Sequence, residues 1–284
     1  MANIFDRQGE TAWCPGCGNF GLRKIMLDAI AELGLKQPET VFVSGIGQAA
    51  KAPQYYNGNF FNGLHGRSLP AAAGIKAANP GLNVIVESGD GDMYGEGGNH
   101  FIHAIRRNPD ITVIVHNNMV YGLTKGQASP TSQEGMVTPI QVDGVFEEPL
   151  NPIALAITMD APFVARGSAG EPEKTKELIK QAIAHRGFSL VDVFQACVSF
   201  NKINTHKWFK EHTYFLPADH DPRDRLSALK RAMEADPMAL GLFYINDNRK
   251  IFEDKLAPYE KSREPLYSRQ RGPEIVNEIL AGKK

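Results

Sequence analysis

Two apolar runs joined by one helical segment constrain the fold more than any other feature of this chain. Residues Asn83–Ser88 (NVIVES) and Ile111–Asn117 (ITVIVHN) are nearly continuous runs of valine and isoleucine. Such runs are typical of parallel strands that are buried on both faces of a sheet. Because Asn99–Arg107 between them is predicted to be a helix, the three segments form a right-handed strand–helix–strand crossover.

Similar segments extend this alternation along most of the chain. We predict strands at Thr40–Ser44, Pro162–Ala165 and Phe188–Phe194, and helices at Phe20–Leu33, Ser68–Ala78 and Pro172–His185. Alternating strands and helices indicate an α/β fold, with a mostly parallel sheet flanked by helices. We therefore expect one such domain over residues 1–200.

The sequence changes character after Phe200, where charged residues and proline become frequent and aromatic residues are scattered. We predict one helix near Asp221–Ala235, with Asp221 as its cap and Pro222 at its first position. The remainder lacks the apolar periodicity of an independent core. Residues 201–284 are therefore expected to form an arm that packs on the main domain or on a partner.

The charge balance and the cysteine number exclude several classes of protein. Lysine and arginine number 31 against 32 aspartate and glutamate, so there is no basic excess for nucleic acid or an anionic membrane. No apolar run reaches the roughly 20 residues of a membrane span, and the first residues do not resemble a signal peptide. Three cysteines argue against a disulfide framework, so we expect a soluble, cytoplasmic protein.

A turn rich in glycine and aspartate, Gly89-Asp90-Gly91-Asp92, directly follows the first apolar run. Glycines there let backbone N–H groups approach a diphosphate, as in dinucleotide-binding folds. Asp90 would repel that diphosphate unless a divalent cation bridged the two groups. Asn118 follows Asp90 by 28 residues and closes the next strand, so both oxygen ligands share one sheet edge. The spacing favours a Mg²⁺–diphosphate site; two unrelated turns are the alternative.

Longer motifs narrow this interpretation to one family. Gly-Asp-Gly followed by Asn117-Asn118 is similar to the thiamine diphosphate signature. Four further motifs occur in order: Trp13–Gly18 (WCPGCG), Ser44–Gly47 (SGIG), Leu64–Arg67 (LHGR) and Tyr121–Gln127 (YGLTKGQ). Together they resemble the β subunit of 2-oxoacid:ferredoxin oxidoreductases, of the two-subunit kind that includes the 2-oxoglutarate enzymes. The resemblance runs from about Trp13 to Asn201 and implies the diphosphate-binding type of thiamine diphosphate fold.

The resemblance assigns roles to particular positions. It implies that Asp90, Asn118 and the Val120 carbonyl hold Mg²⁺. The residues implied to bind the cofactor are Ile46, Gly47, His65, Gly89, Asp90, Gly91, Asp92, Asn118, Val120, Gly122 and Leu123. Those implied to act in catalysis are His65, Leu123, Lys125 and Lys51, the last by meeting the substrate carboxylate. The alternatives are that His65 only enters a helix, that Leu123 only packs and that Lys51 is a solvated lysine.

The resemblance also implies an activity and partners. The reaction would be oxidative decarboxylation of a 2-oxoacid, foremost 2-oxoglutarate, to an acyl-CoA, with electrons passed to ferredoxin. The activating glutamate would come from an α subunit that carries the pyrimidine-binding domain. The chain would then be catalytically incomplete outside this heterodimer. Two alternatives are a subunit of a non-oxidative thiamine diphosphate-dependent 2-oxoacid decarboxylase and a non-catalytic cofactor-binding or electron-carrier subunit.

The three cysteines, Cys14, Cys17 and Cys197, raise a separate question. A Cys-x-x-Cys pair alone fits a redox dithiol or half of a zinc site. In the resembled family four cysteines ligate a [4Fe–4S] cluster, and Gln48 stands at the third of these positions. Three outcomes follow: a cluster on three thiolates with one labile iron, recruitment of another ligand such as His206, or no cluster. We predict an iron–sulfur cluster.

Overall fold

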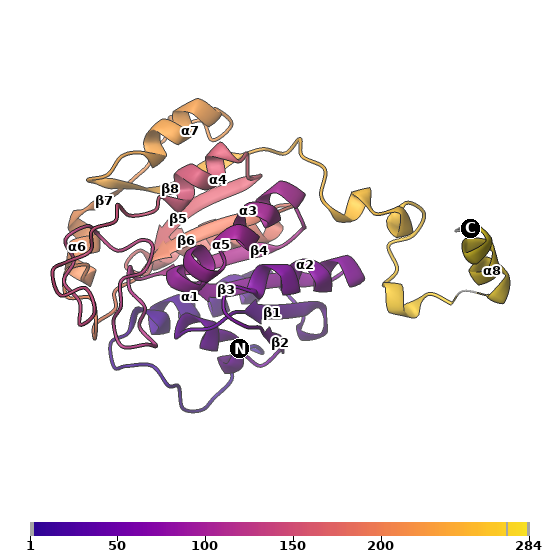
Figure 1. Ribbon diagram of the computed structural model, residues 1–284, viewed down its shortest axis with the longest axis horizontal. Coiled ribbons are helices and arrows are strands. Elements are labelled where there is room, and N and C mark those ends of the chain that lie inside the picture. The colour runs from indigo at the N-terminus through magenta and orange to yellow at the C-terminus, as the bar shows by residue number, and fades with distance from the viewer. Residues whose placement is uncertain (1–2, 271, 283–284) are drawn as a thin grey trace.

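The computed structural model describes residues 3–270 and 272–282 and centres on one eight-stranded sheet (Figure 1). The strand order is β2-β1-β3-β4-β6-β5-β8-β7. The strands are β1 (Thr40–Ser44), β2 (Asn59–Asn62), β3 (Asn83–Gly89), β4 (Thr112–Asn117), β5 (Phe163–Ser168), β6 (Ser189–Phe194), β7 (Thr213–Phe215) and β8 (Met238–Ile245). Among the pairs of described strands, only that of β5 with β8 is antiparallel. The predicted α/β fold with a mostly parallel sheet is confirmed.

Helices cover both faces of this sheet. They are α1 (Gly18–Glu32), α2 (Ser68–Ala78), α3 (Gly98–Arg107), α4 (Pro152–Thr158), α5 (Pro172–Ala184), α6 (His206–Glu211), α7 (Arg225–Ala232) and α8 (Pro273–Ala281). Helices α1 and α5 pack in one hydrophobic core, and α2, α3, α4 and α7 pack in the other. Within the described ranges, no helix is long and apolar enough to cross a membrane.

The two cores explain the continuous apolar runs of the central strands. In β3, Val84 and Val86 belong to the core under α2 and α3, whereas Ile85 belongs to the core under α1 and α5. Successive side chains of a strand point to opposite faces, so a sheet covered on both faces needs an apolar residue at every position. The strands and helices predicted before Phe200 are confirmed, with ends that shift by a few residues.

The segment after Phe200 differs from the expected irregular arm with one helix. β8 (MALGLFYI) pairs with β5 inside the sheet, and its Leu240 and Phe243 are fully buried. The pairing shifts register between Val164 and Ala165 of β5, opposite Leu242–Tyr244 of β8, and the neighbouring Gly241 has φ +124°. These irregularities break the alternation that would have revealed the strand. Residues on both sides of position 200 thus share one sheet, and the boundary between domain and arm stays a prediction.

The predicted helix in this segment is shorter than expected and begins later. α7 starts at Arg225, and Asp224 rather than Asp221 caps it. The Asp224 carboxylate accepts hydrogen bonds from the backbone N–H groups of Leu226 (3.0 Å) and Ser227 (3.1 Å). The prediction that Asp221 caps the helix and Pro222 occupies its first position is therefore wrong, because Asp224 is the residue that reaches the free N–H groups.

The described residues after β8, 246–270 and 272–282, form an arm that leaves the body of the molecule (Figure 1). Its first part is anchored, because Glu253 is buried and the Tyr259 hydroxyl donates to the Ala77 carbonyl of α2 (2.5 Å). Its last element, α8, lies away from the sheet and exposes the apolar side chains Ile275 and Ile279. The arm is thus fixed at its base and extended at its tip.

Candidate cofactor-binding site

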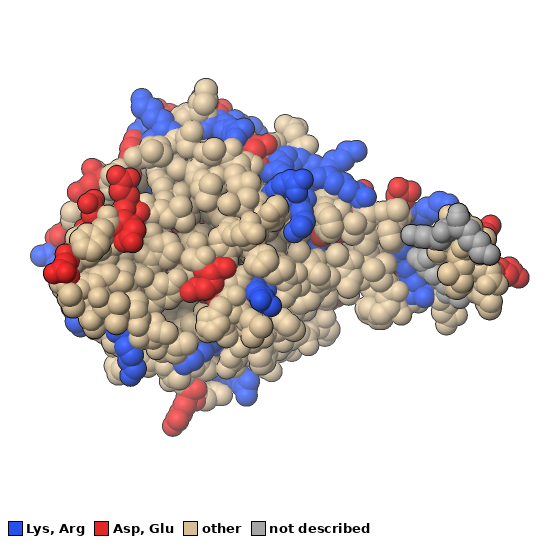
Figure 2. Space-filling view, viewed as in Figure 1, with Lys and Arg blue, Asp and Glu red and all other residues tan. Residues whose placement is uncertain are grey.

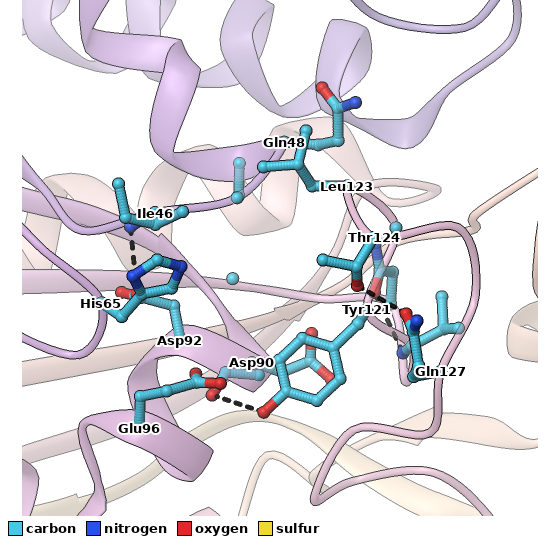
Figure 3. A pocket seen from close by; sticks show the side chains of 17 residues that line it. Ile46, Gln48, His65, Asp90, Asp92, Glu96, Tyr121, Leu123, Thr124 and Gln127 are labelled. Atoms are coloured by element: carbon cyan, nitrogen blue, oxygen red, sulfur yellow. Dashed lines mark hydrogen bonds between the residues drawn. The ribbon is translucent and has the colours of Figure 1, made fainter. Parts of the chain in front are cut away.

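A cavity of about 370 Å³ lies at the carboxyl ends of β1, β3 and β4 (Figure 3). Its volume falls in the range of about 300–1,000 Å³ that is usual for small-molecule sites. All residues predicted to bind the cofactor line it, namely Ile46, Gly47, His65, Gly89, Asp90, Gly91, Asp92, Asn118, Val120, Gly122 and Leu123. The structure therefore brings together, at the edge where α/β folds bind ligands, segments that are far apart in the sequence.

Asp90 lies at the end of β3 and is almost completely buried. The hydroxyls of Ser129 and Thr131 both donate to its Oδ2, each at 2.6 Å. Burial raises the pKa of Asp90 to about 6, although these two hydroxyl donors act in the opposite direction. A carboxylate desolvated in this way gains from a cation placed beside it. Asp90 therefore fits the predicted role of a metal ligand.

Asn118, directly after β4, lines the same cavity as Asp90. Its Oδ1 accepts a hydrogen bond from the Val120 N–H (3.1 Å), and its backbone carbonyl accepts one from Asn201 Nδ2 (3.1 Å). An amide oxygen carries two lone pairs, so Oδ1 can still bind a cation. The side chains of Asp90 and Asn118 thus offer oxygen atoms as metal ligands, which Mg²⁺ prefers.

Asp92 has a different set of partners from the one predicted for it. Its Oδ1 accepts from the backbone N–H groups of Ile46 (3.0 Å) and Gly66 (2.8 Å), and its Oδ2 accepts from the Ser88 hydroxyl (2.5 Å). A Cβ at Gly45 would lie 1.9 Å from Asp92 Oδ2, so only glycine fits there. Asp92 therefore ties the loop after β1 to the start of α2, and a direct contact with a diphosphate stays a prediction.

The turn after β3 packs tightly against the loop after β4. Gly91 begins a π-helical turn, Gly91–Glu96, and a Cβ on it would lie 2.2 Å from Tyr121 Cε1. The Tyr121 hydroxyl donates to the Gly91 carbonyl (3.3 Å) and points toward the turn that carries Glu96 (Figure 3). Burial and the negative charge of Glu96 raise the pKa of Tyr121. Glycine at position 91 is what permits this contact.

The predicted catalytic residues divide into two groups. His65 and Leu123 line the cavity and are exposed at its walls. Lys51, in the 3-10 helix after β1, and Lys125, in the loop after β4 with φ +82°, are not among the described residues that line the cavity. The catalytic roles of all four residues stay predictions.

The cavity also contains residues that the sequence interpretation did not name as cofactor-binding. They are Gln48, Ala49, Glu96, Tyr121, Thr124 and Gln127. The last three belong to the quoted YGLTKGQ motif, whose loop is closed by a hydrogen bond from the Tyr121 N–H to the Gln127 carbonyl (2.8 Å). The motif itself was therefore the signal that could have identified them.

The three cysteines line a second, smaller cavity beside the first. The Cys17 N–H donates to the Cys14 carbonyl (3.0 Å), and the Gly18 N–H donates to the Ala196 carbonyl next to Cys197 (3.2 Å). A Cβ on Gly18 would lie 2.7 Å from the Cβ of Gln195, so glycine allows this close approach. Burial raises the pKa of the Cys17 thiol, and the neighbouring thiols Cys197 and Cys14 raise it further.

The arrangement of the three thiols does not by itself show that they bind a metal. All three cysteines are free. The part of the chain that the structure describes holds no group of three or more His, Cys, Asp or Glu side chains that could hold a metal ion. Zinc needs all its thiolates within about 2.3 Å of one ion, whereas a cluster spreads its thiolates over several irons. The described residues thus show neither a zinc site nor a cluster, and the iron–sulfur cluster stays a prediction.

The cofactor cavity and the cysteine cavity share a wall. Gln48, Asn118 and Gly122 line both of them. His206, which the sequence offered as another ligand, lines a separate cavity with Lys210 and is not among the described residues around the cysteines. The structure therefore places Gln48, rather than His206, beside the three thiols.

Comparisons with known proteins agree with this fold and site. Residues 41–193 match the family described as thiamine pyrophosphate enzyme, C-terminal TPP binding domain. Residues 197–261 match the family that describes the C-terminal part of the pyruvate ferredoxin oxidoreductase beta chain. The first match spans the sheet from β1 to β6 and so includes most segments that line the cavity. It supports thiamine diphosphate as the cofactor.

Relatives over nearly the whole chain define the family more closely. The chain is 43% identical over 276 residues to 2-oxoacid:ferredoxin oxidoreductase 1, subunit beta, of Aeropyrum pernix, covering 93% of this chain and 85% of the relative. It is 45% identical to the corresponding subunit of Saccharolobus solfataricus, covering 90% and 87%. It is 38% identical to the 2-oxoglutarate synthase subunit KorB of Archaeoglobus fulgidus, covering 89% and 90%.

A solved structure extends the match to three dimensions. The 2-oxoglutarate:ferredoxin oxidoreductase of Magnetococcus marinus, with 2-oxoglutarate, coenzyme A and succinyl-CoA bound, aligns with a TM-score of 0.91 and 35% identity. The alignment covers 99% of this chain and 94% of the solved one. The chain belongs to the family of 2-oxoacid:ferredoxin oxidoreductase β subunits. The predicted family and enzyme class are thus confirmed.

Proposed function

We propose that this chain binds thiamine diphosphate and Mg²⁺ in the cavity at the ends of β3 and β4. With an α subunit, it would oxidatively decarboxylate a 2-oxoacid, foremost 2-oxoglutarate. The observation that carries this proposal is that buried Asp90 and partly buried Asn118 meet in a cavity lined by all the residues predicted to bind the cofactor. The choice of 2-oxoglutarate as substrate is supported by the relative that is a 2-oxoglutarate synthase subunit and by the solved enzyme with 2-oxoglutarate bound.

The residues present fit both groups. Asp90, Asn118 and the Val120 carbonyl would hold Mg²⁺. The two hydroxyl donors of Asp90 both bind Oδ2, so we expect Oδ1 to face the cation. The diphosphate would lie along the turn after β3, where Gly89 and Gly91 leave the backbone accessible. When bound, thiamine diphosphate supplies the nucleophilic carbon and the electron sink for loss of CO₂.

This chain's own residues would orient the reactants and exclude water. Asp92 fixes the loop of Ile46 and Gly47 through the Ile46 N–H, so this wall of the cavity is held before a ligand arrives. Leu123 would cover the reacting centre with an apolar side chain. His65 would donate or accept a hydrogen bond at the cavity wall. Lys51 would meet the substrate carboxylate, and Lys125 would face the reacting centre, although neither lysine is among the described residues that line the cavity.

The overall reaction requires an electron acceptor. One 2-oxoacid and one coenzyme A would give one acyl-CoA, one CO₂, one proton and two electrons, which balances atoms and charge. We propose an iron–sulfur cluster on Cys14, Cys17 and Cys197 as the first acceptor, since these thiols lie across a shared wall from the cofactor cavity. Ferredoxin would then take the electrons one at a time.

We propose that the site is made complete by the α subunit. The β-subunit family implies such a partner, and the activating carboxylate would come from its pyrimidine-binding domain. Glu96 is the glutamate that lines the cavity in the described structure, but it is exposed and belongs to the turn beside the metal ligands. The free state of all three cysteines suits a reducing compartment, and we propose the cytoplasm.

The decisive experiment is anaerobic reconstitution with the α subunit. The complex would receive thiamine diphosphate, Mg²⁺ and coenzyme A, and reduction of a low-potential dye would be followed with a panel of 2-oxoacids. We expect CoA-dependent dye reduction that is fastest with 2-oxoglutarate and absent with either subunit alone. Release of CO₂ and aldehyde without dye reduction would instead establish the non-oxidative decarboxylase. Failure of the two subunits to associate would favour a non-catalytic role.

A further inference from the structure

The side chain of Gln48 carries an unusual combination of features. Its Oε1 is buried and makes no hydrogen bond to any residue in the described part of the chain. A buried amide oxygen without a partner is costly, by about 1–3 kcal/mol, and such atoms call for an explanation. An unfilled ligand position is one such explanation, because a metal ion satisfies an oxygen lone pair as well as a donor does.

The position of Gln48 shows where such a ligand would lie. Gln48 lines the cavity of the three cysteines as well as the cofactor cavity. Its amide points away from the carboxylates of Asp90 and Glu96 at the other end of the cofactor cavity (Figure 3). The backbone here is held in place, because Trp13 Nε1 donates to the Gln48 carbonyl (2.8 Å). The buried oxygen without a partner therefore belongs to a residue that lies between the cofactor cavity and the cysteine cavity.

We propose that Gln48 offers its amide oxygen to the fourth iron of a cluster whose other three irons bind Cys14, Cys17 and Cys197. This inference rests on the cluster proposed above and adds the identity and the consequence of its fourth ligand. A neutral amide oxygen is a weaker ligand for iron than a thiolate, because soft sulfur ligands suit iron–sulfur clusters better. The iron at this corner is therefore the exchangeable one, and it lies on the side of the cofactor cavity.

The chemistry of iron release makes this inference testable. A [4Fe–4S]²⁺ cluster that gives one electron to ferricyanide and releases one Fe²⁺ leaves a [3Fe–4S]⁺ cluster, which balances both iron and charge. The complex with the α subunit would be purified anaerobically and analysed for iron and sulfide. It would then be treated with one equivalent of ferricyanide per cluster, and electron paramagnetic resonance would count the three-iron product.

Variants at position 48 test whether the amide oxygen of Gln48 is the iron ligand. We expect ferricyanide to convert the cluster fastest in Gln48→Ala, more slowly in the wild type, and about tenfold or more slowly in Gln48→Cys than in the wild type, where a thiolate replaces the amide. Gln127→Cys is the matched control, since Gln127 lines the cofactor cavity but not the cysteine cavity. It should convert at the wild-type rate.

Three results would overturn the inference. Equal conversion in the wild type and Gln48→Ala would show that the amide oxygen does not bind iron. Retention of all four irons in the wild type, as in Gln48→Cys, would show that another strong ligand is present. Absence of iron and sulfide from wild-type protein would remove the cluster itself, while leaving the thiamine diphosphate site to be tested by the dye assay.

Discussion

Single residues at the carboxyl edge of the sheet combine a functional role with a cost in stability. Asp90 is the clearest case, because burial raises its pKa from 3.8 to about 6. Its ionised form is thus less favourable in the folded protein than in the unfolded chain. The free energy of unfolding is therefore highest below the pKa that Asp90 has in the unfolded chain, where the carboxyl is protonated in both states. It falls as the pH rises through the pKa that Asp90 has in the folded protein.

Replacement of Asp90 by asparagine should reveal this cost. At pH 7.5 the apoprotein of Asp90→Asn should be more stable than the wild type by up to about 3 kcal/mol, since one pKa unit is about 1.4 kcal/mol. The difference should shrink as the pH is lowered from 7.5 to 5, because the wild-type carboxyl takes up its proton. Denaturant unfolding without Mg²⁺ would measure it. A difference that did not depend on pH would contradict the assigned cause.

The same variant should lose metal-dependent cofactor binding, which calorimetry with Mg²⁺ and thiamine diphosphate would detect. Glu96→Gln is the matched control, because it also removes a carboxylate from the cavity wall but not from the proposed metal site. Binding by Asp90→Asn at wild-type affinity would refute the assignment of Asp90 as a ligand.

Thr131 should position the proposed metal ligand Asp90 without touching the metal. Its hydroxyl lies 2.6 Å from Asp90 Oδ2 and 3.0 Å from Asn117 Oδ1. Thr131→Val keeps the shape and removes the hydroxyl, and outer-shell losses of this kind typically cost about 10–100-fold in metal affinity. We expect Thr131→Val to weaken Mg²⁺ binding by at least about tenfold and Thr131→Ser to restore it. Equal binding by the valine and serine variants would exclude this role.

Among the elements, the short turn after β3 does the most to shape the site. It begins at Gly91, directly after Asp90, and it carries Asp92 and Glu96 around one wall of the cavity. Its contact with Tyr121 joins it to the loop after β4. The two elements therefore behave as one unit, although 30 residues separate Gly91 from Tyr121.

A methyl group at Gly91 should push the turn after β3 away from Tyr121 in the loop after β4. Gly91→Ala places a Cβ 2.2 Å from the Tyr121 ring, and overpacking of this kind costs about 1–3 kcal/mol. We expect the variant to fold but to bind thiamine diphosphate and Mg²⁺ about tenfold or more weakly, measured by calorimetry. Gly98→Ala is the control, because its Cβ would meet no atom within 4 Å. Similar binding by both variants would show that the Tyr121 contact is not needed.

The elements also show what could be read from the sequence. The apolar runs of β3 and β4 were recognisable because both faces of the sheet are covered, and the Asp90–Asn118 spacing then located the cavity. β8 was missed because Gly241 and a register shift interrupt its pattern. The partners of Asp92 could not be inferred, since the N–H groups of Ile46 and Gly66 come from loops whose meeting depends on tertiary packing. The orphaned oxygen of Gln48 is likewise invisible without coordinates.

At the scale of the whole molecule, charges of each sign gather at different places on the visible face. Figure 2 shows an acidic group at one end of the body, near α6 in Figure 1, and a group of lysine and arginine side chains where the arm leaves the body. The arm continues beyond this body. Arg269 donates to the carbonyls of Ser262 and Glu264 and lies 4.8 Å from the centre of the Tyr259 ring, so this part of the arm is held by its own contacts.

Removal of the arm tip should therefore leave the body intact. A chain that ends at Lys261 should unfold within about 0.5 kcal/mol of the full chain, as is usual for changes at the surface. A chain that ends at Ile251 loses buried Glu253, whose Oε2 accepts from the Asp110 N–H (3.2 Å), and Tyr259. It should be clearly less stable. Thermal melting of both would decide, and equal loss of stability would show that the tip supports the core.

The reversed direction of β8 has a practical consequence. Ile245 at its end pairs with Phe163 at the start of β5, so the chain leaves the sheet at the edge opposite the cavity. A fluorescent dye or an affinity handle attached to α8 would therefore sit remote from the reacting groups. Such a probe could report how the subunits come together in real time, while turnover in the same sample is recorded undisturbed. Assembly and chemistry can thus be observed through separate ends of one molecule.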